Sequence, residues 1–337
     1  MKASSFNSEL SKPQHILYHL QISQSYPPTI TTKMPWKDQL NKFKQELNHL
    51  VAEPKAASQP PPVPPHPPSG PPFRGEVYWK PQFYPNVPVN HEWDAKLGNG
   101  PDGWGNNELQ FYTAEPQNSF HTPEGMLVLR ALANNSAPSP EQRYTSARLV
   151  SKQTLARDKG VLSATILSPC AEGIWPAFWL LPKEPFSWPT DGEIDIAETW
   201  NGDHENRTCL HWGHHHEPQK HRVLGSRIPD MHCRPVRYDF AWEQPNGVPG
   251  QGRMIWYIDG RPVMKGEIPS GTRPLRDMTI LLNVAIGGNV CGGKTPRDGY
   301  YDMVVYSLSM ESELEYGGWG RFEQDWHHPS VSLGNTY

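Results

Sequence analysis

The chain has 337 residues, enough for one large domain or two small ones, and its 31 basic and 35 acidic side chains give a formal net charge of −4. Without a basic excess there is no electrostatic reason to expect nucleic acid or an anionic membrane surface as a partner. No apolar run approaches the length of a membrane-spanning helix. The 37 prolines argue against an all-helical fold, because proline inside a helix breaks it.

The N-terminus shows no secretory signal, since polar residues interrupt each apolar run. By sequence we therefore expect a cytoplasmic protein, and Met34 is a plausible alternative start. The four cysteines (Cys170, Cys209, Cys233 and Cys291) are widely spaced without a CxxC pair, so we expect reduced thiols rather than a disulfide scaffold.

Two segments precede the β-rich part of the chain. Residues 1–53 form an N-terminal extension in which apolar residues recur at helical spacing over 36–51, which predicts a short amphipathic helix. Residues 54–72 contain ten prolines, which predicts a polyproline II spacer. A ligand for an SH3-like groove is the alternative interpretation of that segment.

From residue 73 to 310 short β-rich runs alternate with turn residues, and no long amphipathic helix lies between them. This pattern predicts an antiparallel sandwich or barrel, with Ile258-Asp-Gly-Arg261 as a hairpin turn. Residues 311–337 are polar and irregular and are expected to form a C-terminal tail. The strand candidates are 126–132, 144–151, 161–167, 193–198, 208–212, 236–242, 254–258, 279–286 and 301–309.

One predicted strand, residues 193–198, carries three carboxylates although acidic residues are disfavoured in strands. Side chains at i and i+2 share a face, so Glu193 and Asp195 point the same way while the isoleucines between them face the core. Glu198 would fall on the wrong face of a regular strand. A bulge at Ile196-Ala197 would return it to the carboxylate face, and bulges are frequent near active sites.

Three carboxylates this close repel one another, which pushes at least one toward protonation at neutral pH. Glycoside hydrolysis needs this pairing of an ionised carboxylate with a protonated carboxyl group. A solvated acidic strand or a calcium site is the alternative. Hydrolysis is favoured by nearby aromatic residues, because aromatic rings stack on the apolar faces of sugars. These residues are Trp175, Phe178, Trp179, Trp188 and Trp200.

The segment Glu193-Ile-Asp195-Ile-Ala-Glu198 resembles the ExDxxE signature of glycoside hydrolase family 16, in the form typical of laminarinase-like endo-β-1,3(4)-glucanases. Further stretches resemble segments of the same family in the same order, so that the resemblance covers roughly residues 73–310. These stretches are GWGNNELQFYT (103–113), YTSAR (144–148), GIWPAFWLLP (173–182) and LNVAIGG (282–288).

The resemblance implies an all-β fold, a β-jelly-roll sandwich of two curved antiparallel sheets with a concave glycan-binding cleft. It also implies retention of anomeric configuration through a covalent glycosyl-enzyme intermediate, with Glu193 as nucleophile, Glu198 as general acid/base and Asp195 tuning the nucleophile. The residues expected to bind substrate are Asn107, Arg148, Trp175, Trp179, Trp188 and His211. A structural ion pair with a carboxylate is the alternative role of Arg148.

We expect no cofactor and no metal. The histidines at 211, 214–216 and 221 lack a cysteine partner in a zinc-binding pattern. Many family members hold a structural calcium ion, for which Asp302 is a matching aspartate, but the segment 79–83 lacks the acidic pair that accompanies it.

The expected partner is a β-glucan, without nucleic acid or membrane, and the protein is expected to be a monomer. The leading hypothesis is a retaining endo-β-glucanase acting on β-1,3 or mixed β-1,3/1,4 linkages. The alternatives are a transglycosylase of wall remodelling and a non-catalytic glucan-binding protein. Because such binding relatives have typically lost the catalytic glutamates, the presence of both Glu193 and Glu198 favours an enzyme.

Overall fold

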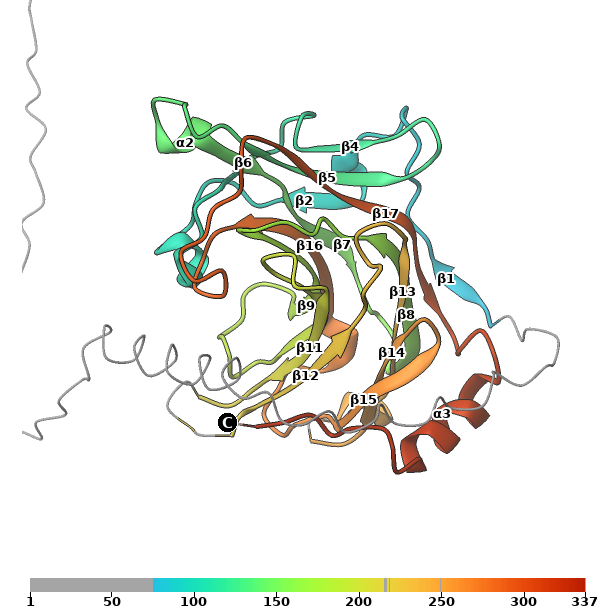
Figure 1. Cartoon of the computed structure of the whole chain (residues 1–337). Coiled ribbons are helices and arrows are strands. Elements are labelled where there is room, and N and C mark those ends of the chain that lie inside the picture. Colours follow the sequence, from blue (N-terminus) through green and yellow to red (C-terminus); the bar gives the residue numbers. More distant parts are fainter. Residues whose placement is uncertain (1–74, 215–216, 218, 249, 337) are drawn as a thin grey trace, which may run out of the picture. The chain divides into compact units, whose positions relative to one another are not determined.

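The computed structural model describes residues 75–214, 217, 219–248 and 250–336. The predicted extension (1–53) and proline-rich linker (54–72) lie outside the described residues. The described chain forms two β-sheets packed face to face (Figure 1), one of ten strands and one of seven. All but one of the strand pairs are antiparallel; the exception joins the short strands β3 and β6, Phe111–Tyr112 and Tyr144–Ser146.

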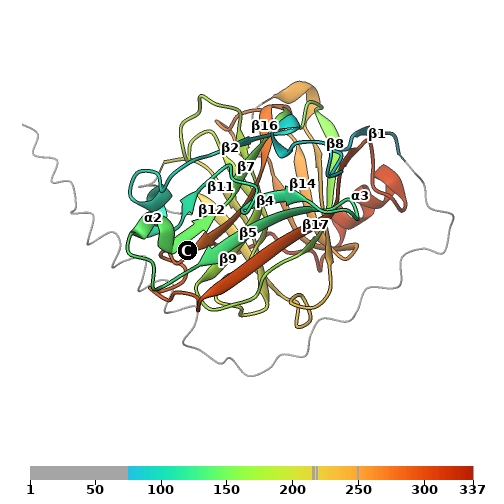
Figure 2. The same ribbon diagram turned by 90° about the horizontal axis from the view of Figure 1, so that it is seen from above.

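In the ten-stranded sheet the long last strand β17 lies between β5 and β8, and Figure 2 shows β17 running beside β5. The strands of this sheet are β1 (Val77–Trp79), β3 (Phe111–Tyr112), β4 (Ser119–His121), β5 (Leu127–Ala133), β6 (Tyr144–Ser146), β8 (Lys159–Leu167), β13 (Val236–Glu243), β14 (Arg253–Ile258), β15 (Arg261–Glu267) and β17 (Gly299–Glu311).

The seven-stranded sheet follows the order β12-β11-β10-β9-β16-β7-β2, so β10 has a strand on either side. Its strands are β2 (Trp93–Ala95), β7 (Arg148–Thr154), β9 (Ile174–Pro182), β10 (Glu193–Glu198), β11 (Glu205–His211), β12 (His221–Arg227) and β16 (Met278–Ile286).

Helices are few and short in the part of the chain that the structure describes. They are α2 (Pro140–Arg143), α3 (Gly318–His327), the 3-10 turns Val89–His91, Pro245–Gly247 and Leu275–Asp277, and a π-type turn at Gly103–Asn107. No helix in the described part of the chain has the length and apolar character needed to cross a bilayer.

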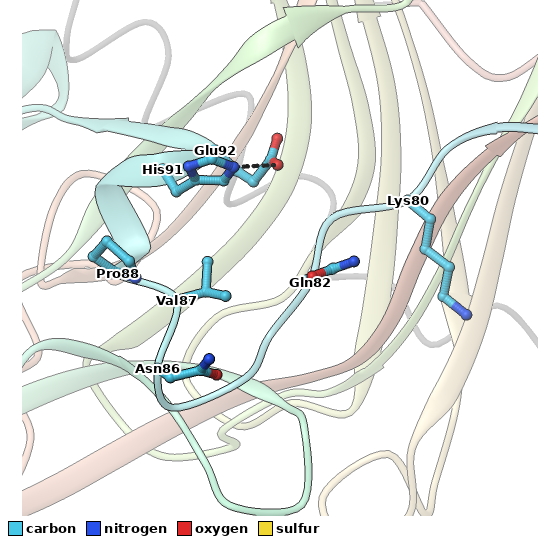
Figure 3. A pocket seen from close by; sticks show the side chains of 7 residues that line it. All are labelled: Lys80, Gln82, Asn86, Val87, Pro88, His91 and Glu92. Carbon is cyan, nitrogen blue, oxygen red and sulfur yellow. Dashed lines mark ion pairs between the residues drawn. The ribbon is translucent and has the colours of Figure 1, made fainter.

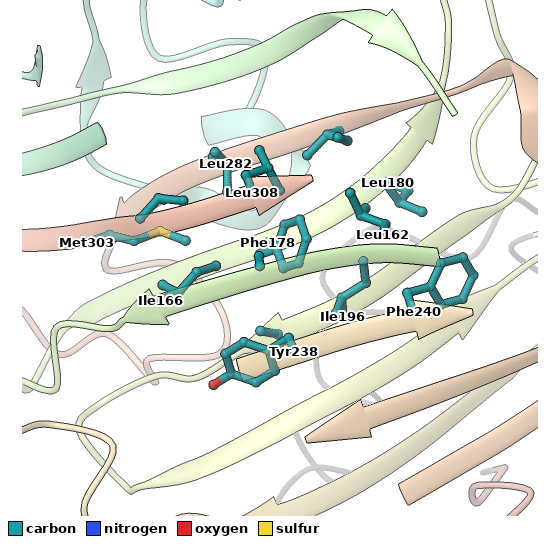
Figure 4. Packing of buried hydrophobic residues seen from close by; sticks show 14 of the residues in the cluster. Leu162, Ile166, Phe178, Leu180, Ile196, Tyr238, Phe240, Leu282, Met303 and Leu308 are labelled. Carbon is teal, nitrogen blue, oxygen red and sulfur yellow. The ribbon is translucent and has the colours of Figure 1, made fainter. Parts of the chain in front are cut away.

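The main core lies between the two sheets. Figure 4 shows Leu162, Ile166, Tyr238 and Phe240 of the ten-stranded sheet packed against Phe178, Leu180, Ile196 and Leu282 of the seven-stranded sheet, and all of them are almost fully buried. Ile194 joins the same cluster. The isoleucines of β10 therefore point inward, which leaves the opposite face of that strand for its carboxylates.

The all-β sandwich expected from the sequence is confirmed, and each strand candidate falls on an observed strand. The hairpin turn is confirmed as well: Ile258 pairs with Arg261, and Asp259 and Gly260 between them have φ angles of 48° and 72°. Two positive φ angles in a two-residue loop are the requirement of a type I′ turn, which Asp-Gly meets.

Two parts of the fold differ from the sequence-based expectation. The central strand β9 was not among the strand candidates, and it contains Pro176, a residue type that sequence patterns associate with edge strands or breaks. The chain after Met310 is not wholly irregular. There β17 continues to Glu311 and α3 packs Phe322 against Val161, Ile255 and Tyr257 of the ten-stranded sheet.

The end of the described chain runs along the edges of both sheets. Ser332 pairs with Met264 of β15, and Asn335 pairs with Val223 of β12 through two backbone hydrogen bonds of 2.8 and 3.0 Å. Both strands lie at the ends of their sheets, where unpaired backbone groups invite pairing with other chains. The C-terminal segment therefore covers part of each edge.

Candidate active site

The carboxylate strand β10 is bulged where the sequence predicted it. Against β9, Asp195 pairs with Trp179 and Ala197 with Phe178, so Ile196 is the extra residue. The pairing with β11 shifts over the same stretch, between Asp195 and Glu198. Ile194, Ile196 and Ala197 are all buried in the core, whereas Glu193 and Glu198 are partly exposed. The extra residue thus accounts for Glu198 sharing the outer face of the sheet with Glu193 and Asp195.

Burial and mutual repulsion raise the pKa values of both glutamates. Burial, followed by the charge of Asp195, raises the pKa of Glu193 to about 7. The same two causes, together with the charge of Glu193, raise the pKa of Glu198 well above its usual range. Both carboxyl groups are therefore weaker acids than a free glutamate, and their mutual repulsion favours a state in which only one of them is ionised.

Two tryptophans hold the glutamates through their indole N–H groups. Trp175 on β9 donates to Oε1 of Glu198 at 2.9 Å, and Trp188, in the loop before β10, donates to Oε2 of Glu193. Trp175 is almost fully buried, whereas the side chain of Trp188 is 47 % exposed. The sequence assigned both residues to sugar binding. The structure gives each of them a carboxylate contact as well, and only Trp188 also offers a large exposed ring.

His211 lies opposite Glu193 on the neighbouring strand β11, and its Nε2 is 3.5 Å from Oδ2 of Asp195. Burial on its own lowers the pKa of His211, but the contact with Asp195 and the charges of Glu193 and Glu198 outweigh it and raise that pKa to about 9. His211 is therefore a cation at neutral pH and offsets part of the negative charge of this face.

Arg148, the first residue of β7, lies between two indole rings. Its guanidinium carbon is 4.5 Å from the ring centroid of Trp104 and 4.7 Å from that of Trp179. Within the described residues no carboxylate lies at ion-pair distance from Arg148, but its charge counters the rise that burial causes in the pKa of Glu108 and Glu193, so it interacts with both at longer range. Trp179 is fixed in turn, because its indole N–H donates to Oδ1 of Asn283 at 2.7 Å.

Asn107 lies farther along this face, in the π-type turn, and is exposed. Its amide donates to Oδ1 of Asn289 at 2.9 Å, and the described contacts do not join it to the three carboxylates. The turn nevertheless packs near Trp175: a side chain at Gly288 would meet the backbone oxygen of Asn106 at 3.2 Å and the Trp175 ring at 3.4 Å. The structure thus brings together every predicted site residue except Asn107, which stands at the margin.

The matching position for a family calcium ion does not fit a cation. Both carboxylate oxygens of Asp302 accept hydrogen bonds of 2.7 Å from the guanidinium of Arg130, and that guanidinium also stacks on the rings of Phe120 and Tyr300. A bidentate guanidinium already supplies the positive charge and the donors that this carboxylate needs. We therefore assign no calcium ion to Asp302.

A separate hollow of about 330 Å³ lies at the loop between β1 and β2 (Figure 3). Most of its lining side chains are polar. Figure 3 shows one ion pair among them, between His91 and Glu92 at 3.6 Å. With a single carboxylate it lacks the acid and nucleophile pair found on β10. The seven residues that line it are Lys80, Gln82, Asn86, Val87, Pro88, His91 and Glu92.

Three residues that the sequence reasoning did not select belong to the site. Trp104 stacks on Arg148, Asn283 orients Trp179, and Cys209 lies directly opposite Asp195 on β11. Trp104 and Asn283 lie within quoted family segments, so those segments carried a signal for them. Cys209 stands two residues before His211, and the period of a strand places both side chains on one face.

Comparison with known proteins finds similarity to one family of glycoside hydrolases. Residues 112–233 match the family model described as the XgeA-like catalytic domain of glycoside hydrolase family 16. The chain is 28 % identical over 227 residues to a β-glucanase of Rhodothermus marinus, covering 63 % of this chain and 76 % of that protein. It is also 28 % identical over 226 residues to the clotting factor G alpha subunit of Tachypleus tridentatus, where the match spans 64 % of this chain and only 30 % of the subunit.

Among solved structures, the laminarinase from Rhodothermus marinus superposes with a TM-score of 0.59 at 26 % identity, covering 71 % of this chain and 98 % of that one. The β-jelly-roll and the resemblance to laminarinase-like members of glycoside hydrolase family 16 are thus confirmed. The relatives that carry this resemblance are named as glycoside hydrolases.

Proposed function

We propose that the protein is a retaining endo-β-glucanase that hydrolyses β-1,3 or mixed β-1,3/1,4 glucan. The observation that carries the proposal is the bulged strand β10, which presents Glu193 and Glu198 on one face, where burial raises the pKa of both. The names of the relatives support the substrate class: one is a β-glucanase and another a laminarinase.

In the first step a carboxylate oxygen of Glu193 attacks the anomeric carbon while the bond to the leaving oxygen breaks and Glu198 gives that oxygen its proton. In the second step Glu198, now ionised, takes a proton from water, and the water oxygen displaces Glu193 from the same carbon. Two inversions restore the original configuration. The pKa of Glu198, raised well above its usual range by burial, suits a general acid, and Glu193, with a pKa of about 7, is the proposed nucleophile.

Asp195 and His211 adjust these two groups. The charge of Asp195 raises the pKa of both glutamates, whereas the charge of His211 lowers the pKa of both and so counters part of that rise. The low exposure of Asp195, 2 %, supports a role beneath the sugar rather than beside it. We therefore assign Asp195 and His211 to positioning and charge balance.

The aromatic residues supply the binding surface for the glucan. Trp188 offers an exposed ring next to the nucleophile, and Trp179 and Trp104 hold Arg148 between them, ready to donate to sugar hydroxyl groups. Asn107 is placed to contact a more distant sugar unit. Ring stacking on sugars and hydrogen bonds to sugar hydroxyl groups do not require a charged ligand, so this surface suits a neutral polysaccharide.

The test is incubation with laminarin and with a mixed-linkage glucan, following product size and the anomeric protons by NMR. Internal cleavage with new β-anomeric reducing ends supports the proposal. Initial release of α-anomeric ends contradicts the retaining mechanism. Longer glucans formed from an oligosaccharide acceptor would instead establish the transglycosylase, and binding without any new ends would establish the glucan-binding protein.

A further inference from the structure

A second group of donor atoms lies within the same strand pair. Asp195 pairs directly with Cys209 across β10 and β11, and His211 follows Cys209 by two residues on the same face. A carboxylate oxygen of Asp195, the sulfur of Cys209 and a ring nitrogen of His211 all lie within 4.8 Å of one another. Strand register, rather than a flexible loop, sets this arrangement.

One atom of the group lacks a hydrogen-bond partner. Oδ2 of Asp195 is buried in a side chain that is 2 % exposed, and none of the described residues donates a hydrogen bond to it. Its nearest charged neighbour, Nε2 of His211, stays at 3.5 Å, the outer limit of a hydrogen bond. A buried carboxylate oxygen without a hydrogen bond can accept a further ligand.

The three donors match the preferences of a thiophilic cation. Zinc binds cysteine sulfur, histidine nitrogen and carboxylate oxygen at about 2.0–2.3 Å, so its ligand atoms stand roughly 3.5 Å apart in a tetrahedral site. Binding at these residues releases the proton of the Cys209 thiol and one proton of the His211 imidazolium to solvent. Small side-chain rotations bring atoms that now lie within 4.8 Å to that spacing. Glu193 lies opposite His211 on the neighbouring strand and, when ionised, adds a negative charge that favours a divalent cation over a neutral ligand.

We propose that Asp195, Cys209 and His211 form a binding site for a thiophilic divalent cation such as Zn²⁺, and that its occupation inhibits the enzyme. The inhibitory part rests on the proposed function. A cation held by Asp195 and His211 withdraws the two groups that balance the charge of Glu193, and it stands on the face where the glucan would lie. Among the described residues no other set of three such donors comes together.

The binding test uses Cd²⁺, whose bond to a thiolate has an ultraviolet charge-transfer absorbance, and the untagged full chain carrying Cys233→Ser. That substitution removes the exposed thiol. We expect one Cd²⁺ per chain with this absorbance, and its loss in the additional variant Cys209→Thr. Cys170→Ser, at a thiol outside the three-residue group, is the matched control and should keep the absorbance. An unchanged signal in Cys209→Thr would overturn the site.

Two further measurements keep the proposal testable. His211→Gln retains the thiol and should weaken Cd²⁺ binding at least tenfold, since even indirect support of a metal ligand is worth about 10–100-fold in affinity. Unchanged affinity there contradicts the site even if Cys209→Thr fails to fold. Zn²⁺ should inhibit laminarin hydrolysis in the wild type and at least about tenfold less strongly in Cys209→Thr, and equal inhibition of both would overturn the inhibitory role.

The outcomes separate this site from the proposed function. Cd²⁺ binding through Cys209 in a protein that cleaves no glucan would leave the site standing and contradict the glucanase. Hydrolysis of glucan by a protein whose Cys209 takes up no Cd²⁺ would support the glucanase and contradict the cation site.

Discussion

Trp175 donates its indole N–H to Oε1 of Glu198 across 2.9 Å, so a nearly buried residue of β9 holds the carboxyl group assigned as general acid. The bond favours the ionised form of Glu198 and thereby limits the rise of its pKa that burial causes. It also fixes the direction in which that carboxyl group can deliver a proton.

Removing this bond should slow catalysis and shift its pH dependence. We expect Trp175→Phe to lower kcat about tenfold, because a hydrogen bond to a charged group is worth about 1.5–3 kcal/mol and 1.4 kcal/mol is tenfold in rate. The pKa of Glu198 should rise further, which moves the alkaline limb of the pH–rate profile to higher pH. Trp200→Phe is the matched control, since Trp200 touches Trp175 edge-on at 6.4 Å. An alkaline limb that stays in place would contradict this role.

The two glutamates should respond differently to an added nucleophile. Glu193→Ala and Glu198→Ala should each reduce laminarin hydrolysis by roughly 10²–10⁴-fold or more. With azide, which needs no general base, Glu198→Ala should recover turnover of an activated aryl glycoside and yield a β-glycosyl azide. Glu193→Ala should yield the α-azide by direct displacement. Glu172→Gln, at an exposed carboxylate paired with Lys294, is the control. An α-azide from Glu198→Ala and a β-azide from Glu193→Ala would contradict the assignment and would make Glu198 the nucleophile and Glu193 the general acid/base.

The acidic limb of the pH–rate profile should report Glu193. Because burial and the charge of Asp195 raise its pKa to about 7, kcat/KM should fall as the pH drops below this value and the nucleophile gains a proton. His211→Gln removes a positive charge that lowers this pKa, so the limb should move to higher pH. Assays contain a chelator, and His327→Gln, on the exposed end of α3, serves as control. A shift to lower pH would contradict the charge balance described here.

The C-terminal helix should contribute to stability. Phe322 is 1 % exposed and packs on Val161, Ile255 and Tyr257, so Phe322→Ala should reduce the free energy of unfolding by about 3–5 kcal/mol. Gln324→Ala, on the exposed side of the same helix, should have little effect. Denaturant unfolding measures both variants. Equal stabilities would mean that α3 does not pack on the sheet in solution.

Stability should not depend on calcium. Since Arg130 engages both oxygens of Asp302, a chelator should leave the Tm unchanged, and added Ca²⁺ should not raise it. Arg130→Met should lower the Tm, because it leaves that carboxylate without its partner. A chelator-induced fall in the Tm that Ca²⁺ reverses would show that a cation binds elsewhere in the chain.

Much of this site could be predicted from local patterns. Alternation along residues 193–198 assigns the isoleucines to the core and the first two carboxylates to the outer face, and the third carboxylate requires the extra residue found at Ile196. The Asp-Gly hairpin likewise depends only on neighbouring residues. Such features have a short range, so a period of two and the backbone preferences of a few side chains determine them.

Other features depend on segments far apart in the chain. The sequence placed Trp175 and Arg148 in the site, but only pairing of β9 with β10 aims the indole at Glu198, and only the fold puts Arg148 between Trp104 and Trp179. Distant segments also determine three other features. These are the raised pKa values of the two glutamates, the pairing of Cys209 with Asp195 and the packing of α3. Tertiary structure decided them because burial, strand register and the summed field of nearby charges exist only once distant segments have packed together.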